Sequence, residues 1–136
     1  MTFERRRFFL TSLIFIMILC LTACQATIQG STGKGSYELK RSITMPNFWE
    51  VLIDGDVNNV YDAALKGVND MGLKIYSRKM DSLSAIVEGS FADETEYSVR
   101  ISYDSPSRTM MRIKAGHTGN KTLSLQLFQA IEKHLN

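Results

Sequence analysis

The chain is poor in the residues that build disulfide frameworks and metal sites. It has two cysteines in 136 residues, Cys20 and Cys24, and both stand at the end of one apolar run near the N-terminus. Its two histidines, His117 and His134, are isolated from these cysteines, whereas a zinc site needs three or four protein ligands. We therefore expect no disulfide framework, no metal and no other cofactor.

The chain also lacks an excess of basic charge beyond its first residues. Its 16 basic and 14 acidic residues give a formal charge of +2. Without Glu4, Arg5, Arg6 and Arg7, 13 residues of each sign remain. Nucleic-acid binding depends on neutralising phosphates with Lys and Arg, so we expect no nucleic-acid partner.

No apolar run has the length that is typical of a transmembrane helix. The longest, from Phe8 to Leu21, is shorter than the roughly 20 residues that a spanning helix needs. Arginines precede it and the small residues Thr22 and Ala23 follow, which is the order of a secretory signal. We therefore predict that residues 1–23 are a cleaved signal peptide. Twin-arginine export is an alternative for "RRRFFL", but the strongly apolar run favours the general secretory route.

The composition of the segment that follows the signal peptide predicts a flexible tether. Between Gln25 and Met45 the sequence shows no sustained periodicity, and Gly30, Gly33 and Gly35 stand among serines and threonines. Such Gly/Ser-rich composition is typical of flexible linkers. We assign residues 24–46 to an N-terminal tether and residues 47–136 to one small domain, which is large enough to fold alone.

Hydrophobic periodicity divides this domain into helices and strands. The stretch "DVNNVYDAALKGVNDMG" carries an apolar stripe of helical spacing, with Asp56 as N-cap and Gly72 after the C-terminus. A second helix begins after Asn120, with His134 placed to interact with its dipole. Period-two alternation and turn residues predict the remaining elements as strands, namely "FWEVLI", "LKIYSRKM", "SAIVEGSF", "EYSVRISY" and "TMMRIKA".

This order predicts an α+β fold. The elements run β-α-β-β-β-β-α, and we expect an antiparallel β-meander with both helices packed on one face. The other face should be exposed to solvent, and we call it the wet face. It should carry Arg78, Glu88, Arg100 and Arg112, with Tyr76 and Met80 beside them. Cross-strand ion pairing is the simpler interpretation of these charges, and an anion or partner surface is the alternative.

Two further hypotheses concern sites. Adaptable methionines and aromatic rings on the apolar side could line a small pocket between helices and sheet, although core packing explains them more simply. The candidate lining residues are Tyr61, Met71, Phe91, Tyr97, Tyr103, Met111 and Phe128. Separately, His117 lies between two glycines in "AGHTGN" and could be a general acid/base if a partner were within hydrogen-bond reach; a solvent-exposed loop histidine is the simpler interpretation.

The stretch "LTAC" at residues 21–24 resembles the lipobox of bacterial lipoproteins. With "VNNVYDAALKGVNDMGLKI", "DSLSAIVEG", "MMRIKAG" and "LFQAIEKHL", the chain resembles a bacterial lipoprotein family with a domain of unknown function, including a virulence-associated outer-membrane lipoprotein of Francisella. The resemblance implies acylation of Cys24, by palmitate or similar chains, and a fold similar to the helix-grip fold. It also implies the outer rather than the inner membrane, because Gln25 is not the aspartate that retains lipoproteins at the inner membrane.

These observations lead to two functional expectations. The first is a lipid-anchored envelope lipoprotein, attached to the membrane through Cys24, whose domain binds an envelope protein or an apolar small molecule without catalysing a reaction. The alternative is an enzyme that acts on an envelope component, with His117 as its acid/base. We expect the first.

Overall fold

Helix α2 begins and ends where the sequence predicts. The computed structural model describes residues 37–135, and α2 spans Val57–Asp70. The Asp56 carboxylate accepts a hydrogen bond from the Asn59 N–H at 2.9 Å, which is the role of an N-cap. At the other end Gly72 has a φ of +64°, a conformation that glycine adopts without strain. The predicted caps are therefore confirmed, and helix α3, Lys121–Glu132, likewise begins after its N-cap Asn120.

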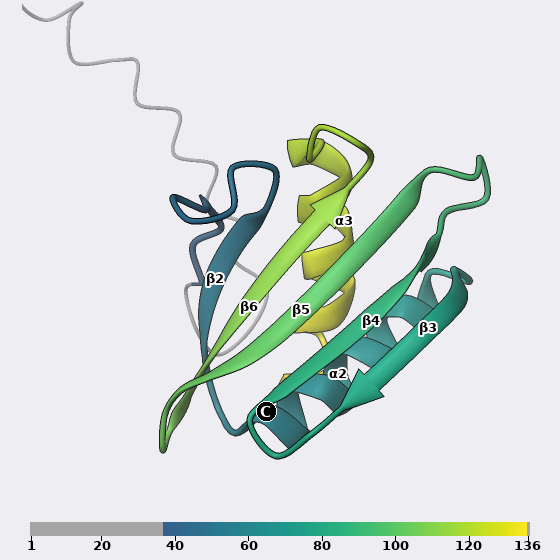
Figure 1. The fold of residues 1–136 in the computed structure, drawn as a ribbon. Helices are drawn as coiled ribbons and strands as arrows, with labels where there is room; N and C mark the ends of the chain where they lie inside the picture. The colour runs from purple at the N-terminus through teal and green to yellow at the C-terminus, as the bar shows by residue number, and fades with distance from the viewer. Residues whose placement is uncertain (1–36, 136) are drawn as a thin grey trace, which may run out of the picture.

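Six strands form one antiparallel sheet (Figure 1). They are β1 Lys40–Arg41, β2 Trp49–Asp54, β3 Lys74–Met80, β4 Ser84–Ser90, β5 Glu96–Ser105 and β6 Arg108–Ala115. Their order across the sheet is β1-β2-β6-β5-β4-β3, so the predicted meander runs from β3 to β6 and β2 joins it beside β6. The α+β class and the predicted order of the seven longer elements are confirmed.

Both helices cover the same face of the sheet, as predicted. In Figure 1 the sheet lies in front of α2 and α3, and the core fills the space between the two layers. The helices approach each other closely at Gly67, where an added Cβ would lie 2.7 Å from Ile131 Cα. The fully buried core side chains come from both layers and include Val60, Val68, Val87, Val99, Ile101, Ile113, Leu127 and Ile131.

The folded domain begins earlier than residue 47. Residues 37–46 fall in the predicted tether, yet β1 pairs with β2 in this segment, with Lys40 opposite Glu50. Tyr37 and Leu39 pack against the core, and the Tyr37 ring meets the Phe128 ring edge-on at 6.2 Å. The Gly/Ser-rich composition ends before Tyr37, so the tether prediction was too long by about this segment. The predicted signal peptide and the rest of the tether lie outside the described residues.

A bulge in β3 corrects part of the predicted wet face. The pairing shifts between Ile75, opposite Gly89, and Ser77, opposite Glu88, so Tyr76 is an extra residue. Such an insertion reverses the alternation of all residues that follow it. Arg78 consequently pairs with Val87, a core residue, and Met80 is turned in the same way. These two side chains do not share a face with Glu88 and Arg100.

Candidate functional site

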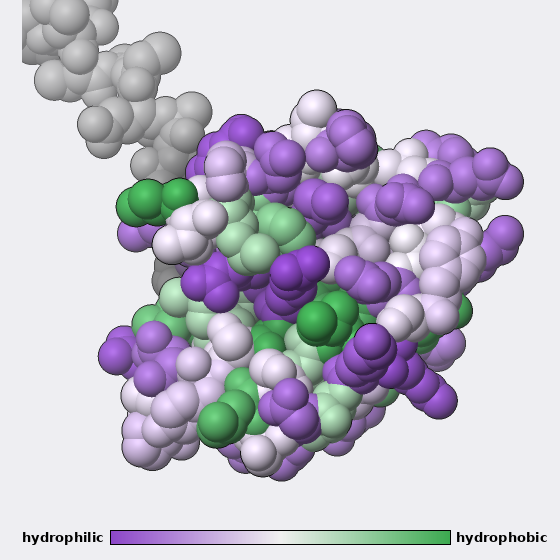
Figure 2. Space-filling model, viewed as in Figure 1, coloured by the Kyte–Doolittle hydropathy of each residue, from purple (hydrophilic) through white to green (hydrophobic). Residues whose placement is uncertain are grey.

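The helices leave one face of the sheet uncovered, which we call the outer face. Four strands contribute a row of directly opposed residues across it: Glu50, Arg112, Arg100 and Ile86. The next row contains Leu52, Met110, Ser102 and Ser84. Figure 2 shows hydrophilic and hydrophobic side chains interspersed on this face. Arginine and methionine next to half-buried aliphatic residues are typical of surfaces that contact proteins.

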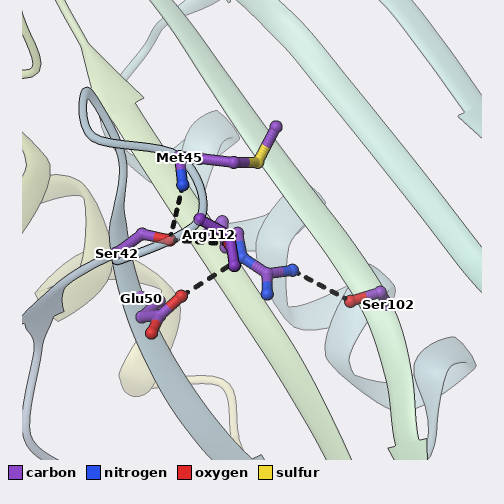
Figure 3. A network of polar contacts seen from close by, with 6 residues as sticks. Ser42, Met45, Glu50, Ser102 and Arg112 are labelled. Atoms are coloured by element: carbon purple, nitrogen blue, oxygen red, sulfur yellow. Dashed lines mark hydrogen bonds and ion pairs between the residues drawn. The ribbon is translucent and has the colours of Figure 1, made fainter.

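Arg112 is neutralised within the sheet. Its Nε lies 3.2 Å from Oε2 of Glu50 on β2, and its Nη1 donates to the Ser102 hydroxyl on β5 at 3.4 Å. Figure 3 shows the guanidinium between these two partners. The expected cross-strand ion pairing is therefore confirmed for Arg112, although its partner comes from β2 rather than from the residues predicted for this face.

Arg100 has a different environment. It lies directly opposite Arg112, and like charges in opposed positions are destabilising in a sheet. Its Nε is buried and has no hydrogen-bond partner among the described residues. The guanidinium instead stacks 5.2 Å from the centre of the Phe48 ring, and Lys114 Nζ lies 5.5 Å from the same ring. Neither Arg100 nor Lys114 takes part in an ion pair among the described residues, so this part of the outer face presents cations that suit carboxylate or phosphate groups.

The loop between β1 and β2 holds Phe48 on the outer face. Ser42, which is 3% exposed, donates its N–H to the Phe48 carbonyl at 2.9 Å, and the Phe48 N–H donates to the Met45 carbonyl at 2.8 Å. The Met45 N–H in turn donates to the Ser42 hydroxyl at 3.2 Å (Figure 3). The hydrophobic periodicity of the sequence could not predict the contact between Phe48 and Arg100. This contact requires β2 to pair with β6 on the edge opposite to β5, and periodicity carries no information on strand order.

A pocket of about 260 Å³ lies where β1 meets β2. Leu52 and Met110 give it an apolar part, and Glu38, Lys40 and Glu50 bring charges of both signs. Lys40 and Glu38 form an exposed ion pair at 3.2 Å. The other residues around the pocket are Tyr37 and Val51. None of the seven residues predicted to line an apolar pocket contributes to it.

Six of those seven predicted pocket residues pack in or against the core. Tyr97, Met111 and Phe128 are at most 2% exposed, and Tyr61, Met71 and Phe91 are partly buried residues that pack against the core. Tyr103 is the exception, because it is 48% exposed and is not part of this cluster. It lies toward the end of β5, close to a register irregularity after residue 103. An apolar pocket between helices and sheet stays a prediction.

The Tyr97 hydroxyl has a structural role as a hydrogen-bond donor. Its hydroxyl donates to the Lys74 carbonyl at 2.9 Å and lies over Gly89, where an added Cβ would be 1.7 Å from that carbonyl oxygen. Burial, with a smaller contribution from nearby Tyr76, raises the pKa of Tyr97 to about 12. The phenol therefore stays protonated near neutral pH and keeps its hydrogen bond.

The two histidines lie apart from each other. His117 is exposed, and the described residues offer it no hydrogen bond or ion pair. The cleft partner that an acid/base role requires is therefore not seen in residues 37–135. His134 lies at the end of α3, where its Nε2 contacts the Asp70 carboxylate at 2.5 Å. This contact joins the C-terminal ends of the two helices.

Within residues 37–135, no three His, Cys, Asp or Glu side chains are grouped so as to hold a metal ion. Neither helix described for this part of the chain is long and apolar enough to cross a bilayer. Cys24, the predicted lipidation site, lies outside the described residues.

Comparison with known proteins identifies a family but no function. No curated protein matches the chain. The sequence pattern of one family matches residues 7–134, a range that takes in the apolar run, Cys24 and the whole of the sheet and both helices. The chain thus belongs to the family described as "Protein of unknown function (DUF3568)".

Proposed function

We propose that the protein is a lipid-anchored lipoprotein of the bacterial cell envelope, attached to the outer membrane through acylated Cys24. The "LTAC" stretch at the end of the apolar run carries this proposal. The family match supports it, because it begins at residue 7 and so includes that run. More than one acyl chain on Cys24 would give stable attachment, since a single chain gives only marginal binding. The outer membrane and a role in virulence rest on the lipoprotein resemblance.

We further propose that the domain acts as a non-enzymatic protein-interaction module through its outer face. The observation that supports this surface is Arg100, which has no ion pair among the described residues and lies opposite Arg112, because an acidic group of a partner would stabilise its charge. Half-buried Leu52, Ile86 and Met110 add apolar area around that charge. The enzyme alternative gains no support from His117, whose ring is exposed.

Exchange of each cysteine tests the anchor. In cells that produce the full chain, Cys24→Ser should abolish the added acyl mass and move the protein from the membrane to the soluble fraction, or leave an uncleaved precursor. Cys20→Ser is the matched control and should change neither mass nor fractionation, because residue 20 leaves with the signal peptide. Equal acylation and membrane attachment of the two variants would contradict the anchor.

Site-specific photo-crosslinking in cells tests the interaction surface. A photoreactive amino acid in place of Met110 on the outer face should yield adducts with an envelope protein. The same amino acid in place of Lys66, an exposed residue of α2, is the control and should yield none of these adducts. Identical adduct patterns at both positions, or none from Met110, would refute the outer face as the binding surface.

A further inference from the structure

Two neighbouring aromatic rings at the start of β2 are each flanked by two cations. On the outer face, Phe48 has Arg100 and Lys114 over its ring, as described above. On the helix side, the centre of the Trp49 ring lies 5.7 Å from Arg41 Cζ and 5.4 Å from Lys121 Nζ. Among the described residues, none of these four cations takes part in an ion pair. A chain whose charges balance beyond residue 23 therefore concentrates unpaired positive charge here.

The loop between β1 and β2, which follows Arg41, presents an exposed apolar side chain. Ile43 is 93% exposed, while the other exposed large hydrophobic residues of the described chain range from 39% to 64%. A single exposed aliphatic residue is common, but Ile43 is exposed more fully than any of these residues and follows Arg41 by two positions. Three of the cations, Arg41, Lys114 and Lys121, are grouped here with the exposed Ile43. We call these four residues the cationic rim.

The rim is rigidly held. The Trp49 indole N–H donates to the Gly119 carbonyl at 2.9 Å, which ties the start of β2 to the loop before α3. Gly119 has a φ of +73°, and an added Cβ would lie 2.0 Å from the Asn47 carbonyl oxygen. With the three hydrogen bonds between Ser42, Met45 and Phe48, these contacts fix the loop from both ends. Ile43 is therefore presented without a large ordering cost on binding.

We infer that the cationic rim docks on an anionic phospholipid surface. A bilayer interface accepts an apolar side chain at the acyl boundary while lipid phosphates attract Lys and Arg around it. Lys114 lies on the outer face, whereas Arg41 and Lys121 lie on the helix side. Cations on both faces of the sheet fit a plane that meets the strand ends better than a partner lying on one face. The first turn of α3 contains no acidic residue, so the positive end of its dipole adds to the same field.

The chain outside the structure brings such a surface within reach. If Cys24 is anchored as proposed, the 13 peptide units to Tyr37 span at most about 45 Å when extended, and roughly 20 Å on average for a flexible Gly/Ser-rich tether. The rim can therefore reach the bilayer that holds the anchor. Docking by the strand ends would leave the outer face free at the side for a protein partner.

Vesicle binding of the unacylated chain tests the inference apart from the anchor. A chain that begins at Gln25 keeps the whole core of residues 37–135 and carries no acyl group. It should cosediment with vesicles of equal parts phosphatidylglycerol and phosphatidylcholine, bind pure phosphatidylcholine at least tenfold more weakly, and lose binding in 0.5 M salt. Equal binding to both vesicle types, or no binding to either, overturns the inference.

Single substitutions locate the contact. Lys114→Gln and Lys121→Gln should each weaken binding to the anionic vesicles about fivefold, and Ile43→Asp about tenfold. Lys66→Gln and Leu83→Asp are matched controls that remove an exposed cation and an exposed apolar residue elsewhere, and they should bind like the parent. Circular dichroism confirms that each variant is folded. If the controls weaken binding as much as the rim variants, or if a crosslinker at residue 43 captures a protein while vesicles do not bind, the inference is wrong.

Discussion

At the scale of single residues, the carboxylate of Glu132 lies in unfavourable surroundings. It lies in the last turn of α3 and is 6% exposed, and its Oε1 has no hydrogen-bond partner among the described residues. The negative end of the helix dipole is unfavourable for a carboxylate at this position. Burial raises the pKa of Glu132 above its ordinary value of 4.5. The ionised form is therefore less stable in the folded protein than in the unfolded chain.

This environment predicts a stability that falls with rising pH. Because the folded pKa is the higher one, the folded state binds more protons than the unfolded state between the two pKa values. The contribution of Glu132 is fully favourable below about pH 4.5 and is lost as the pH rises through the folded pKa. Glu132→Gln should remove this loss and raise the free energy of unfolding at pH 7 by about 1 kcal/mol.

Urea unfolding at pH 4 and pH 7 checks this prediction. The stability difference between Glu132→Gln and the parent should be larger at pH 7 than at pH 4, whereas Glu96→Gln, at an exposed position, should show little difference at either pH. A Glu132→Gln variant that is less stable than the parent at pH 7 would mean that the carboxylate has a partner outside residues 37–135.

At the scale of elements, local signals predicted most of the fold. Asp56 and Asn120 cap their helices because their side chains accept hydrogen bonds from the backbone N–H three residues on, which depends only on nearby sequence. The bulge at Tyr76 was not predictable, because period-two alternation carries no sign of an inserted residue. The hydrogen bond from the Tyr97 hydroxyl on β5 to the Lys74 carbonyl on β3 passes over Gly89 beside this bulge. It joins two strands that are brought together only when the sheet forms, so no local pattern predicts it.

The candidate site was less predictable than the elements that carry it. The sequence placed Arg100 and Arg112 on the wet face correctly, since both follow the alternation of their strands. It could not supply Glu50 on β2 or Phe48 just before β2, because the place of β2 beside β6 is set by long-range packing. The pairing of charges on this face thus depends on sheet order rather than on any local pattern.

The close contact between the helices gives a prediction at this scale. Gly→Ala in the interior of an exposed helix stabilises it by about 1 kcal/mol. At Gly67 the added methyl would meet the Ile131 backbone at 2.7 Å, so α2 and α3 would have to move apart. Gly67→Ala should therefore destabilise the protein, by about 1–3 kcal/mol in urea unfolding. Asn69→Ala, exposed on the same helix, is the control, and greater stability of Gly67→Ala than of the parent would contradict the helix contact.

At the scale of the whole molecule, residues 37–46 connect the proposed tether to the domain. They bury Ser42, place Tyr37 and Leu39 against the core and cover the edge of β2. Without them β2 would be an open strand of six residues, and open edges tend to pair with other chains. The same segment forms the pocket and carries Ile43, so it contributes both to stability and to the surfaces proposed for binding.

Chains that begin at Gln25, Tyr37 and Asn47 test where the domain starts. The first two should unfold at the same urea concentration, because residues 25–36 are predicted to be tether. The chain that begins at Asn47 should be less stable by about 2–4 kcal/mol, the cost of losing two partly buried side chains and the β1 pairing. It should also associate as its concentration rises, since the edge of β2 is then free; sedimentation velocity measures this. If the Asn47 chain matched the Tyr37 chain in stability and stayed monomeric, residues 37–46 would be tether after all, and Ile43 would not be rigidly presented.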